Sequence, residues 1–259
     1  MTNNIDIKSK EIVIFDLDQT LTESKSDLDS EMADLLGKLL KVKKVVVISG
    51  GSFNQFLNQF LSKLSHISNL TNLTILPTSG TRMYVWNGTW TEKYAENFTQ
   101  KEKDIIFEAF NNAFKKTNYK EPSQVFGQVL EDRGSQITFS GLGQKAPLEL
   151  KSKWDPDRTL REPIVQSLKN DLPLFDVRFG GISSIDVTKK GVNKGFGIRK
   201  LEKYTGISIE NMVFIGDALY YGGNDYAAKA TGIDCIAVSG PQDVKEIIKE
   251  WLRIYSIQA

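Results

Sequence analysis

Short apolar runs alternate with segments of helical periodicity in the first third of the chain. Apolar runs at residues 12–15, 45–48 and 73–76 predict three buried strands. Between them, apolar side chains recur every three or four residues at 28–40 and 53–64, which predicts two helices that each bury one face. This alternation of strands and helices indicates parallel strands joined by right-handed crossovers.

The pattern changes after residue 81. The stretch RMYVWNGTW is aromatic and alternating around Asn87-Gly88, which predicts a hairpin. One helix is expected to begin at the capping box 99–102 and another at Asp155-Pro156, although Pro163 should end, kink or divide the second. Further strands are expected near residues 124–130, 135–139, 176–179 and 184–187. Together these elements predict a small antiparallel α+β module.

The last quarter returns to the first pattern. Helices are expected at 194–204, after Asn224 and from Pro241 onwards, with strands at 212–215 and 235–238. The two outer segments therefore predict one doubly wound, Rossmann-like α/β core with a parallel sheet, formed by residues 1–81 and 188–259. Residues 82–187 would form an α+β cap domain inserted between the two halves.

Composition narrows the class of protein. The 259 residues carry 33 Lys and Arg against 32 Asp and Glu, so the chain lacks the basic excess that is typical of nucleic-acid binding. Cys235 is the only cysteine, which excludes an intrachain disulfide and a multi-cysteine zinc site. The N-terminal residues lack an apolar signal core, and no apolar run is long enough to span a membrane. We expect a cytoplasmic protein with no membrane or nucleic-acid partner.

Polar side chains follow three of the expected parallel strands. Asp16 and Asp18 follow the first strand, Ser49-Gly50-Gly51 follow the second, and Asp217 follows residues 212–215. In open α/β sheets, ligands bind beyond the carboxyl ends of the strands. Acidic side chains that converge there repel one another unless a cation lies among them. Because the candidate ligands are hard oxygens without His or Cys, Mg²⁺ is the expected ion.

Each of these residues also has a purely structural explanation. An aspartate after a strand often serves as a turn or cap residue. Ser and Gly are common in strand-to-helix turns, and an isolated lysine such as Lys194 is usually solvated. It is the order of the signals along the chain that favours a functional site.

In that order, the stretches FDLDQTLT, VISGG, GVNKG and FIGDALYYGGND resemble the four motifs of the haloacid dehalogenase-like superfamily of phosphotransferases. The α+β insertion after the third strand resembles the branch of that superfamily with a cap at this position. Within the branch, the chain is most similar to eukaryotic-type phosphomannomutases. Their fourth motif has the same long form, and their cap ends in Ser-Phe-Asp-Val, which residues 184–187 match closely.

The resemblance implies a role for each motif residue. Asp16 would be the nucleophile that forms an aspartyl-phosphate, and Asp18 would be the general acid and base. Mg²⁺ would bind the Asp16 carboxylate, the Asp18 backbone carbonyl and Asp217. The phosphoryl oxygens would be held by Thr20, Ser49, Gly50 and Lys194. Asn224 and Asp225 would support these groups, with Asp225 orienting Lys194 or a metal-bound water.

Two departures from the family pattern affect the interpretation. Gln19 stands where the family usually has glycine. In the cap, Arg133 matches an arginine-rich stretch that grips the second phosphate of a sugar bisphosphate, but Gln144 stands where a second arginine is expected. Lys145 could partly replace that arginine. Ser184 and Asp186 would bind sugar hydroxyls, or would simply form a polar strand face.

Three functions are compatible with this pattern. We expect a Mg²⁺-dependent phosphatase of a small phosphorylated metabolite, a phosphosugar, acting through an aspartyl-phosphate. The alternative is a hexose phosphomutase of the phosphomannomutase type, which must hold either phosphate of a bisphosphate. A non-catalytic phosphosugar-binding module is a third option, disfavoured because every motif position is filled. Tyr84, Trp86 and Trp90 could form cap core or a dimer face, and the oligomeric state stays open.

Overall fold

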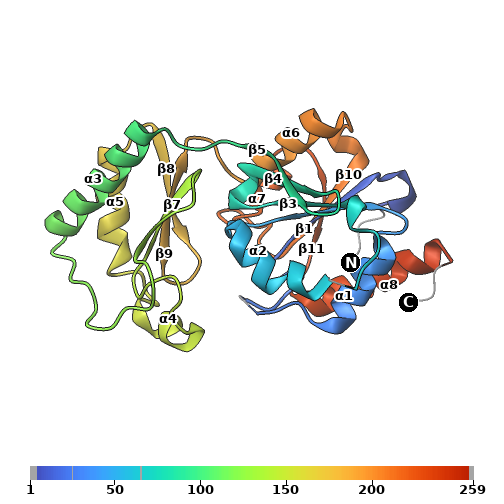
Figure 1. The fold of residues 1–259 in the computed structure, drawn as a ribbon, viewed down its shortest axis with the longest axis horizontal. Helices are drawn as coiled ribbons and strands as arrows, with labels where there is room; N and C mark the ends of the chain where they lie inside the picture. The colour runs from blue at the N-terminus through green and yellow to red at the C-terminus, as the bar shows by residue number, and fades with distance from the viewer. Residues whose placement is uncertain (1–4, 25, 65, 257–259) are drawn as a thin grey trace. The chain divides into compact units, whose positions relative to one another are not determined.

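The computed structural model describes residues 5–24, 26–64 and 66–256. The chain divides into two compact units (Figure 1). The first unit runs to Tyr94 and resumes at Asn193, and the second comprises Ala95–Val192. We call them the core and the cap.

The core contains one seven-stranded sheet. Its strands lie in the order β11 (Asp234–Ala237), β10 (Met212–Gly216), β1 (Ile12–Asp16), β2 (Lys44–Ile48), β3 (Leu73–Leu76), β4 (Arg82–Trp86) and β5 (Trp90–Ala95). The first five strands are parallel, and β4 runs antiparallel to β3. The expected fold class, a doubly wound α/β core with an inserted α+β unit, is confirmed.

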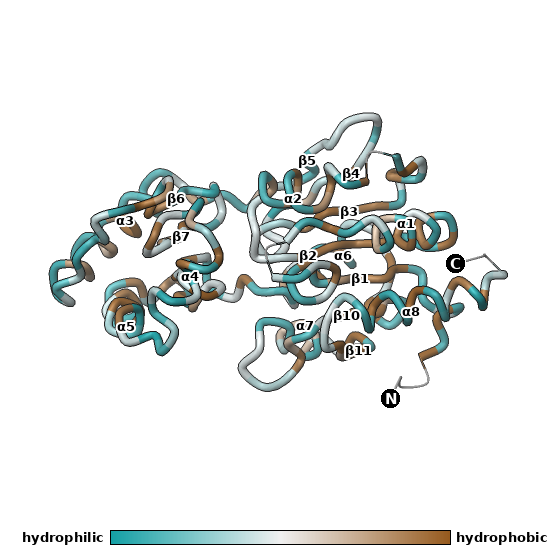
Figure 2. Tube along the Cα trace, turned by 90° about the horizontal axis from the view of Figure 1, so that it is seen from below, coloured by the Kyte–Doolittle hydropathy of each residue, from teal (hydrophilic) through white to brown (hydrophobic). Residues whose placement is uncertain are grey.

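Helices cover both faces of this sheet. Val13 and Phe15 of β1 belong to a cluster with α1 (Ser30–Leu39), α2 (Phe53–Gln59) and α8 (Pro241–Ile254). Ile12 and Ile14 belong to a second cluster with α6 (Lys194–Thr205) and α7 (Tyr226–Lys229). Because both faces are buried there, the central strands β1, β2 and β10 are mostly apolar, and Figure 2 shows the hydrophobic colouring along β1 and β3. Short 3-10 helices lie at Ile7–Ser9, Leu61–Leu64, Leu70–Asn72, Thr78–Gly80 and Ile209–Asn211.

The cap contains one antiparallel sheet. Its order is β6 (Leu130–Asp132), β7 (Gln136–Ser140), β9 (Ser184–Lys189) and β8 (Phe175–Gly180). Ile137 and Ile185 pack with α3 (Gln100–Lys116) and α5 (Arg161–Asp171), while α4 (Leu148–Trp154) lies between β7 and α5 in the sequence. The expected capping box of α3 is confirmed, because Thr99 and Glu102 satisfy each other's backbone N–H groups.

The hairpin at 82–95 belongs to the core rather than to the cap. Its first strand pairs with β3 in the register Thr74↔Val85. Tyr84 stacks on Phe53 with 3.8 Å between ring centroids, and Trp86 and Trp90 also pack against the core cluster. The cap therefore begins 13 residues later than residue 82, where we expected it. A local alternating pattern predicts a hairpin but not the sheet that it joins.

Two cap elements also begin later than expected. The strand expected near 124–130 is confined to Leu130–Asp132, and Gly127 within the expected range adopts a positive φ of 80°, which does not fit an extended strand. The helix expected at Asp155-Pro156 begins at Arg161. Pro163 lies in its first turn, where a missing N–H removes no helical hydrogen bond.

A buried ion pair fixes the start of α5. Asp155 Oδ2 accepts a hydrogen bond from Arg161 Nε at 2.6 Å, and both side chains are at most 2% exposed. Asp155 also accepts from the backbone N–H groups of Leu160 and Arg161, so that one carboxylate caps the helix and neutralises the guanidinium. The Arg161 Nη1 group reaches the carbonyl of Ser184 on β9, which ties α5 to the cap sheet.

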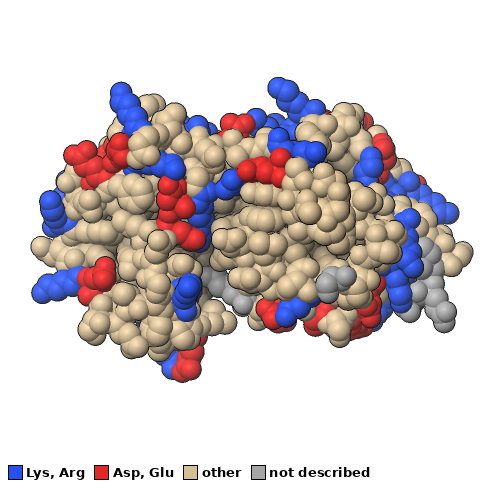
Figure 3. Space-filling model, in the orientation of Figure 1, with Lys and Arg blue, Asp and Glu red and all other residues tan. Residues whose placement is uncertain are grey.

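Neither the surface charge nor the hydropathy of the described residues points to a particular binding partner. Figure 3 shows acidic and basic side chains interspersed over the visible face, in keeping with the balanced composition. Among the described residues, no helix combines the length and apolar character needed to cross a membrane.

Asp155→Ala should destabilise the protein by roughly 3–5 kcal/mol, because it leaves a buried guanidinium without its carboxylate. Asp157→Ala, in the same segment but solvent-exposed, serves as the matched control and should change stability by less than about 1 kcal/mol. Urea denaturation measures both variants. Equal losses in the two would contradict a structural role for the buried pair.

Candidate active site

The candidate site lies at the carboxyl end of β1. Asp16 is the last residue of β1 and is 3% exposed, and Lys194 is the first residue of α6 and is 2% exposed. The Lys194 ammonium lies 2.7 Å from Asp16 Oδ1. Asn193 caps α6 by accepting the Phe196 N–H at 3.0 Å, which fixes Lys194 in the first turn. The structure thus joins two motif residues that are 178 positions apart.

Asp225 completes the environment of Lys194. It is fully buried, and its Oδ1 accepts a hydrogen bond from the Lys194 ammonium. Its Oδ2 accepts the Ala218 N–H at 3.0 Å. Gly216 makes room for this carboxylate, since a Cβ there would lie 2.3 Å from Asp225 Oδ2. Asp225 therefore contacts Lys194 directly, whereas Asn224 beside it is exposed.

Asp217 lies at the same edge, one residue beyond β10. Thr20 Oγ1 donates to Asp217 Oδ1 at 3.3 Å. One carboxylate oxygen from each of Asp16, Asp217 and Asp225 lies within 4.8 Å of the others. Such a group of hard oxygens can hold a metal ion. Of the expected ligands, Asp16 and Asp217 are in this group; Asp18 was expected to contribute only its backbone carbonyl.

The electrostatics of the cluster explain why it fits a cation. Burial raises the pKa of Asp16 to about 7, although Lys194 acts in the opposite direction. Burial and the Asp225 charge also raise the pKa of Asp217. Burial alone would lower the pKa of Lys194, but Asp16 and Asp225 outweigh it and raise that pKa. One lysine therefore compensates three carboxylates only in part, and a divalent ion would supply the missing positive charge.

The turn after β1 holds Asp18 and Thr20. The Leu17 carbonyl accepts hydrogen bonds from the N–H groups of Leu21 and Thr22 at 2.9 and 3.0 Å, so the chain forms a tight turn here. Gln19 adopts a φ of 61°, the left-handed conformation in which glycine carries no side-chain penalty. This explains the usual glycine of the family at this position. Asp18 is half-buried and Thr20 is fully buried.

Ser49 follows the strand that neighbours β1. Ile48 is the register partner of Asp16, so Ser49 lies one residue beyond it at the same sheet edge. Ser49 is buried, and its Oγ accepts the Gly51 N–H at 3.1 Å, which leaves the hydroxyl proton available for donation. Gly50 has space for a side chain, since a Cβ there would meet only Ser79 Oγ, at 4.0 Å.

The expected substrate residues of the cap lie on or near its sheet. Asp186 accepts from Thr138 Oγ1 at 2.8 Å, and a Cβ on Gly180 would overlap its carboxylate. Ser184 is buried on the same strand. The Arg133 guanidinium lies 2.7 Å from the Glu131 carboxylate.

Near Gln144, sequence reasoning missed Lys151. This lysine is buried, and its ammonium donates to the Gln144 carbonyl at 2.8 Å. The surrounding polar residues Glu149, Ser152 and Lys153 gave it the pattern of a solvated lysine, so no local signal marked it. Lys145, which we considered as a replacement for the missing arginine, is exposed.

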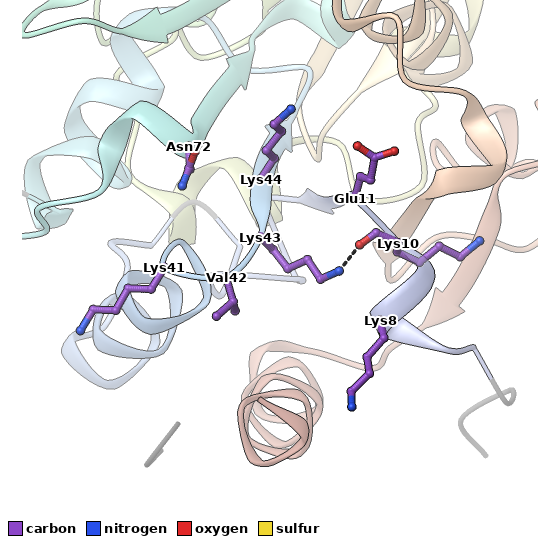
Figure 4. A pocket seen from close by; sticks show the side chains of 8 residues that line it. All are labelled: Lys8, Lys10, Glu11, Lys41, Val42, Lys43, Lys44 and Asn72. Carbon is purple, nitrogen blue, oxygen red and sulfur yellow. Dashed lines mark hydrogen bonds between the residues drawn. The ribbon is translucent and has the colours of Figure 1, made fainter. Parts of the chain in front are cut away.

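A separate hollow lies at the opposite, amino end of the strands. It is lined by Lys8, Lys10, Glu11, Lys41, Val42, Lys43, Lys44 and Asn72. Figure 4 shows that the lysine side chains point in different directions, and Lys43 donates to the Lys10 carbonyl. Lys10 is also neutralised by Asp234 at 2.6 Å. The lysines do not converge on one point, so this hollow is not the candidate active site.

The raised pKa of Asp16 makes the stability of the metal-free protein depend on pH. Its folded pKa of about 7 exceeds the usual 3.8, so the folded state binds the proton more tightly and stability falls as pH rises from about 4 to above 7. The full shift corresponds to at most roughly 4 kcal/mol. Asp16→Asn should therefore raise the melting temperature at pH 8 by several degrees and reduce the difference between pH 5.5 and 8.

Thermal denaturation in the presence of a chelator measures this effect. The exposed Asp104→Asn, whose carboxylate accepts a hydrogen bond from the Gln100 side-chain amide, serves as the control and should leave the pH dependence unchanged. A melting temperature of Asp16→Asn that equals that of the unmodified protein at both pH values would contradict the assigned electrostatics.

Comparison with known proteins places the chain in a family. The model of the eukaryotic phosphomannomutase family matches residues 32–254. The phosphomannomutase of Encephalitozoon cuniculi is 26% identical over 257 residues, covering 94% of each chain, and human phosphomannomutase 1 is 24% identical over 224 residues, covering 85% of this chain and 83% of the human one.

Solved structures share the fold. Plasmodium falciparum IMP-nucleotidase superposes with a TM-score of 0.71 at 17% identity, over 96% of this chain and 70% of that one. A haloacid dehalogenase-like hydrolase from Bacteroides thetaiotaomicron gives 0.66 at 16% identity, over 93% and 99%. With the aspartates, serine and lysine of the four motifs in place, this chain is an enzyme of the haloacid dehalogenase-like superfamily and belongs to its eukaryotic phosphomannomutase family.

Proposed function

We propose that this protein is a hexose phosphomutase of the phosphomannomutase type, which transfers a phosphoryl group through Asp16. The single observation that carries the proposal is the buried cluster of Asp16, Lys194 and Asp225 at the carboxyl end of β1. A structural ion pair would need only one carboxylate for one lysine. Here Asp225 can hold Lys194 by itself, so the Asp16 carboxylate is available to accept a phosphoryl group.

In the proposed reaction, a carboxylate oxygen of Asp16 attacks phosphorus and the ester P–O bond breaks. Asp18, two residues further along, donates a proton to the leaving oxygen and later removes one from the attacking hydroxyl. Lys194 and the hydroxyls of Thr20 and Ser49 would neutralise or hold the phosphoryl oxygens, together with the Gly50 N–H. These roles are sufficient, because phosphoryl transfer depends mainly on positioning the reacting groups and neutralising the charge of the phosphoryl oxygens.

Mg²⁺ fits the donor set of this site. Asp16, Asp217 and the Asp18 carbonyl would hold the ion, which when bound neutralises charge between the carboxylates and the phosphoryl group. Both oxygens of Asp225 are already engaged, by Lys194 and by the Ala218 N–H, so we assign Asp225 to the positioning of Lys194.

The family match favours the mutase over the phosphatase that the sequence alone suggested. The relatives that match over most of their length are named phosphomannomutases. A phosphatase remains the second candidate because of two features of the cap. The Arg133 guanidinium is already paired with Glu131, and Gln144 supplies no charge for a second phosphate. Weaker binding of that phosphate would allow water to compete with the sugar hydroxyl in attacking the aspartyl-phosphate.

Product analysis separates these two functions. With mannose 1-phosphate, Mg²⁺ and a trace of hexose 1,6-bisphosphate, mannose 6-phosphate should form at least about tenfold faster than inorganic phosphate, because transfer to a hydroxyl outpaces hydrolysis. Asp16→Asn should lower both rates by on the order of a thousandfold or more. Phosphate release that matches or exceeds mutase turnover would assign the protein as a phosphatase instead.

The cap assignment has its own test. Gln144→Arg should raise the ratio of mutase to phosphatase turnover severalfold, since bidentate arginine is better suited to a phosphate than an amide. Gln166→Arg adds the same charge on the exposed face of α5 and should leave the ratio unchanged. If both variants shift the ratio equally, net charge rather than a cap phosphate site is responsible.

A further inference from the structure

Three consecutive residues shortly after β3, separated from it by Pro77, adopt the left-handed conformation. Thr78, Ser79 and Gly80 have φ values of 48°, 58° and 83°. Only glycine adopts this conformation without a steric penalty, and a β-branched threonine in it is a clear outlier. Such strain persists only where surrounding contacts enforce it, and it is concentrated at functional sites. The contacts of this segment, the 78–80 turn, therefore indicate its purpose.

On one side, the 78–80 turn binds the loop that follows β2. The Thr78 N–H donates to the Gly51 carbonyl at 2.9 Å, and the Ser79 N–H donates to the Ser49 carbonyl at 2.8 Å. Thr78 is 1% exposed, so the bond to Gly51 is shielded from water. The turn thereby fixes the backbone of Ser49, which the proposed function assigns to the phosphoryl group.

On its other side, the 78–80 turn contacts α6. A Cβ on Gly80 would lie 2.3 Å from the Cα of Gly197, so the two backbones touch without intervening side chains. Gly197 lies one helical turn after Lys194 on the same rigid helix. The Tyr94 hydroxyl donates to the Gly80 carbonyl at 2.8 Å and holds the turn against the helix from β5.

We propose that the 78–80 turn is a positioning element that sets the separation between Ser49 and Lys194. These two residues lie on different elements, and the turn contacts the backbone of both elements directly. It touches neither substrate nor metal in this account and acts only through those residues. The inference rests on the proposed function, which assigns Ser49 and Lys194 to the same phosphoryl group. A displacement of about 1 Å in such a group can cost a hundredfold in rate.

Gly80→Ala tests the proposal, with Gly206→Ala as the matched control. Gly206 ends α6 with a φ of 72° and would have no atom within 4 Å of a Cβ, so both variants carry a backbone penalty but only one displaces α6. Competitive inhibition by orthovanadate, which resembles the transferring phosphoryl group, reports on the site separately from stability. Gly80→Ala should raise the vanadate Ki and lower kcat by at least tenfold, while Gly206→Ala should stay within twofold.

Gly197→Ala provides a milder variant in case Gly80→Ala does not fold. Its Cβ would lie 3.1 Å from the Cα of Gly80 and 2.6 Å from the end of the flexible Ile48 side chain, so a small shift accommodates it. We expect a severalfold rise in the vanadate Ki. An unchanged Ki in Gly197→Ala, or equal effects of Gly80→Ala and Gly206→Ala, would overturn the positioning role.

Lys194→Ala separates failure of this inference from failure of the proposed function. If Lys194→Ala leaves the vanadate Ki unchanged, Lys194 does not hold the phosphoryl group, and both proposals fail. If Lys194→Ala weakens inhibition by tenfold or more but the Gly80 and Gly197 variants do not, only the positioning role of the 78–80 turn is wrong.

Discussion

The contact of one buried lysine with two buried carboxylates is the constraint on which the rest of the core site depends. Burying a charged group costs free energy unless an opposite charge lies beside it. Lys194 has two such neighbours, Asp16 and Asp225. They meet because β1 and β10 end, and α6 begins, at the same edge of the sheet. Gly216 leaves space for the Asp225 carboxylate, and the Asn193 cap fixes the first turn of α6.

The pairing of Lys194 with two carboxylates suits a lysine whose neighbour Asp16 changes its charge during the proposed reaction. In the proposed reaction, Asp16 loses its negative charge when it becomes an aspartyl-phosphate, and the phosphoryl oxygens take its place beside the ammonium. Asp225 keeps Lys194 charged and in position throughout, since its second oxygen is anchored by the Ala218 N–H. The remaining negative charge of the cluster favours the binding of a cation by the same carboxylates.

Local sequence patterns predicted those features that depend on local residues. Buried apolar runs located β1 and β2, and the residues that follow the expected strands placed Asp16 and Asp217 at one sheet edge, whereas Lys194 was added by the family resemblance. Features that depend on distant contacts could not be predicted in this way: the hairpin at 82–95 joins the core sheet, Lys151 is buried, and Thr78 and Ser79 adopt a left-handed conformation that usually requires glycine. No single window of sequence contains both partners of those contacts.

Trapping the phosphorylated intermediate is the most direct test of whether Asp16 receives the phosphoryl group. The protein would be incubated briefly with hexose 1,6-bisphosphate and Mg²⁺, quenched in acid, digested and analysed by mass spectrometry. We expect one phosphoryl group on the peptide that contains Asp16, and hydroxylamine should remove it because it is an acyl phosphate. A phosphoryl group on another residue, or none in a sample that is turning over, would contradict this expectation.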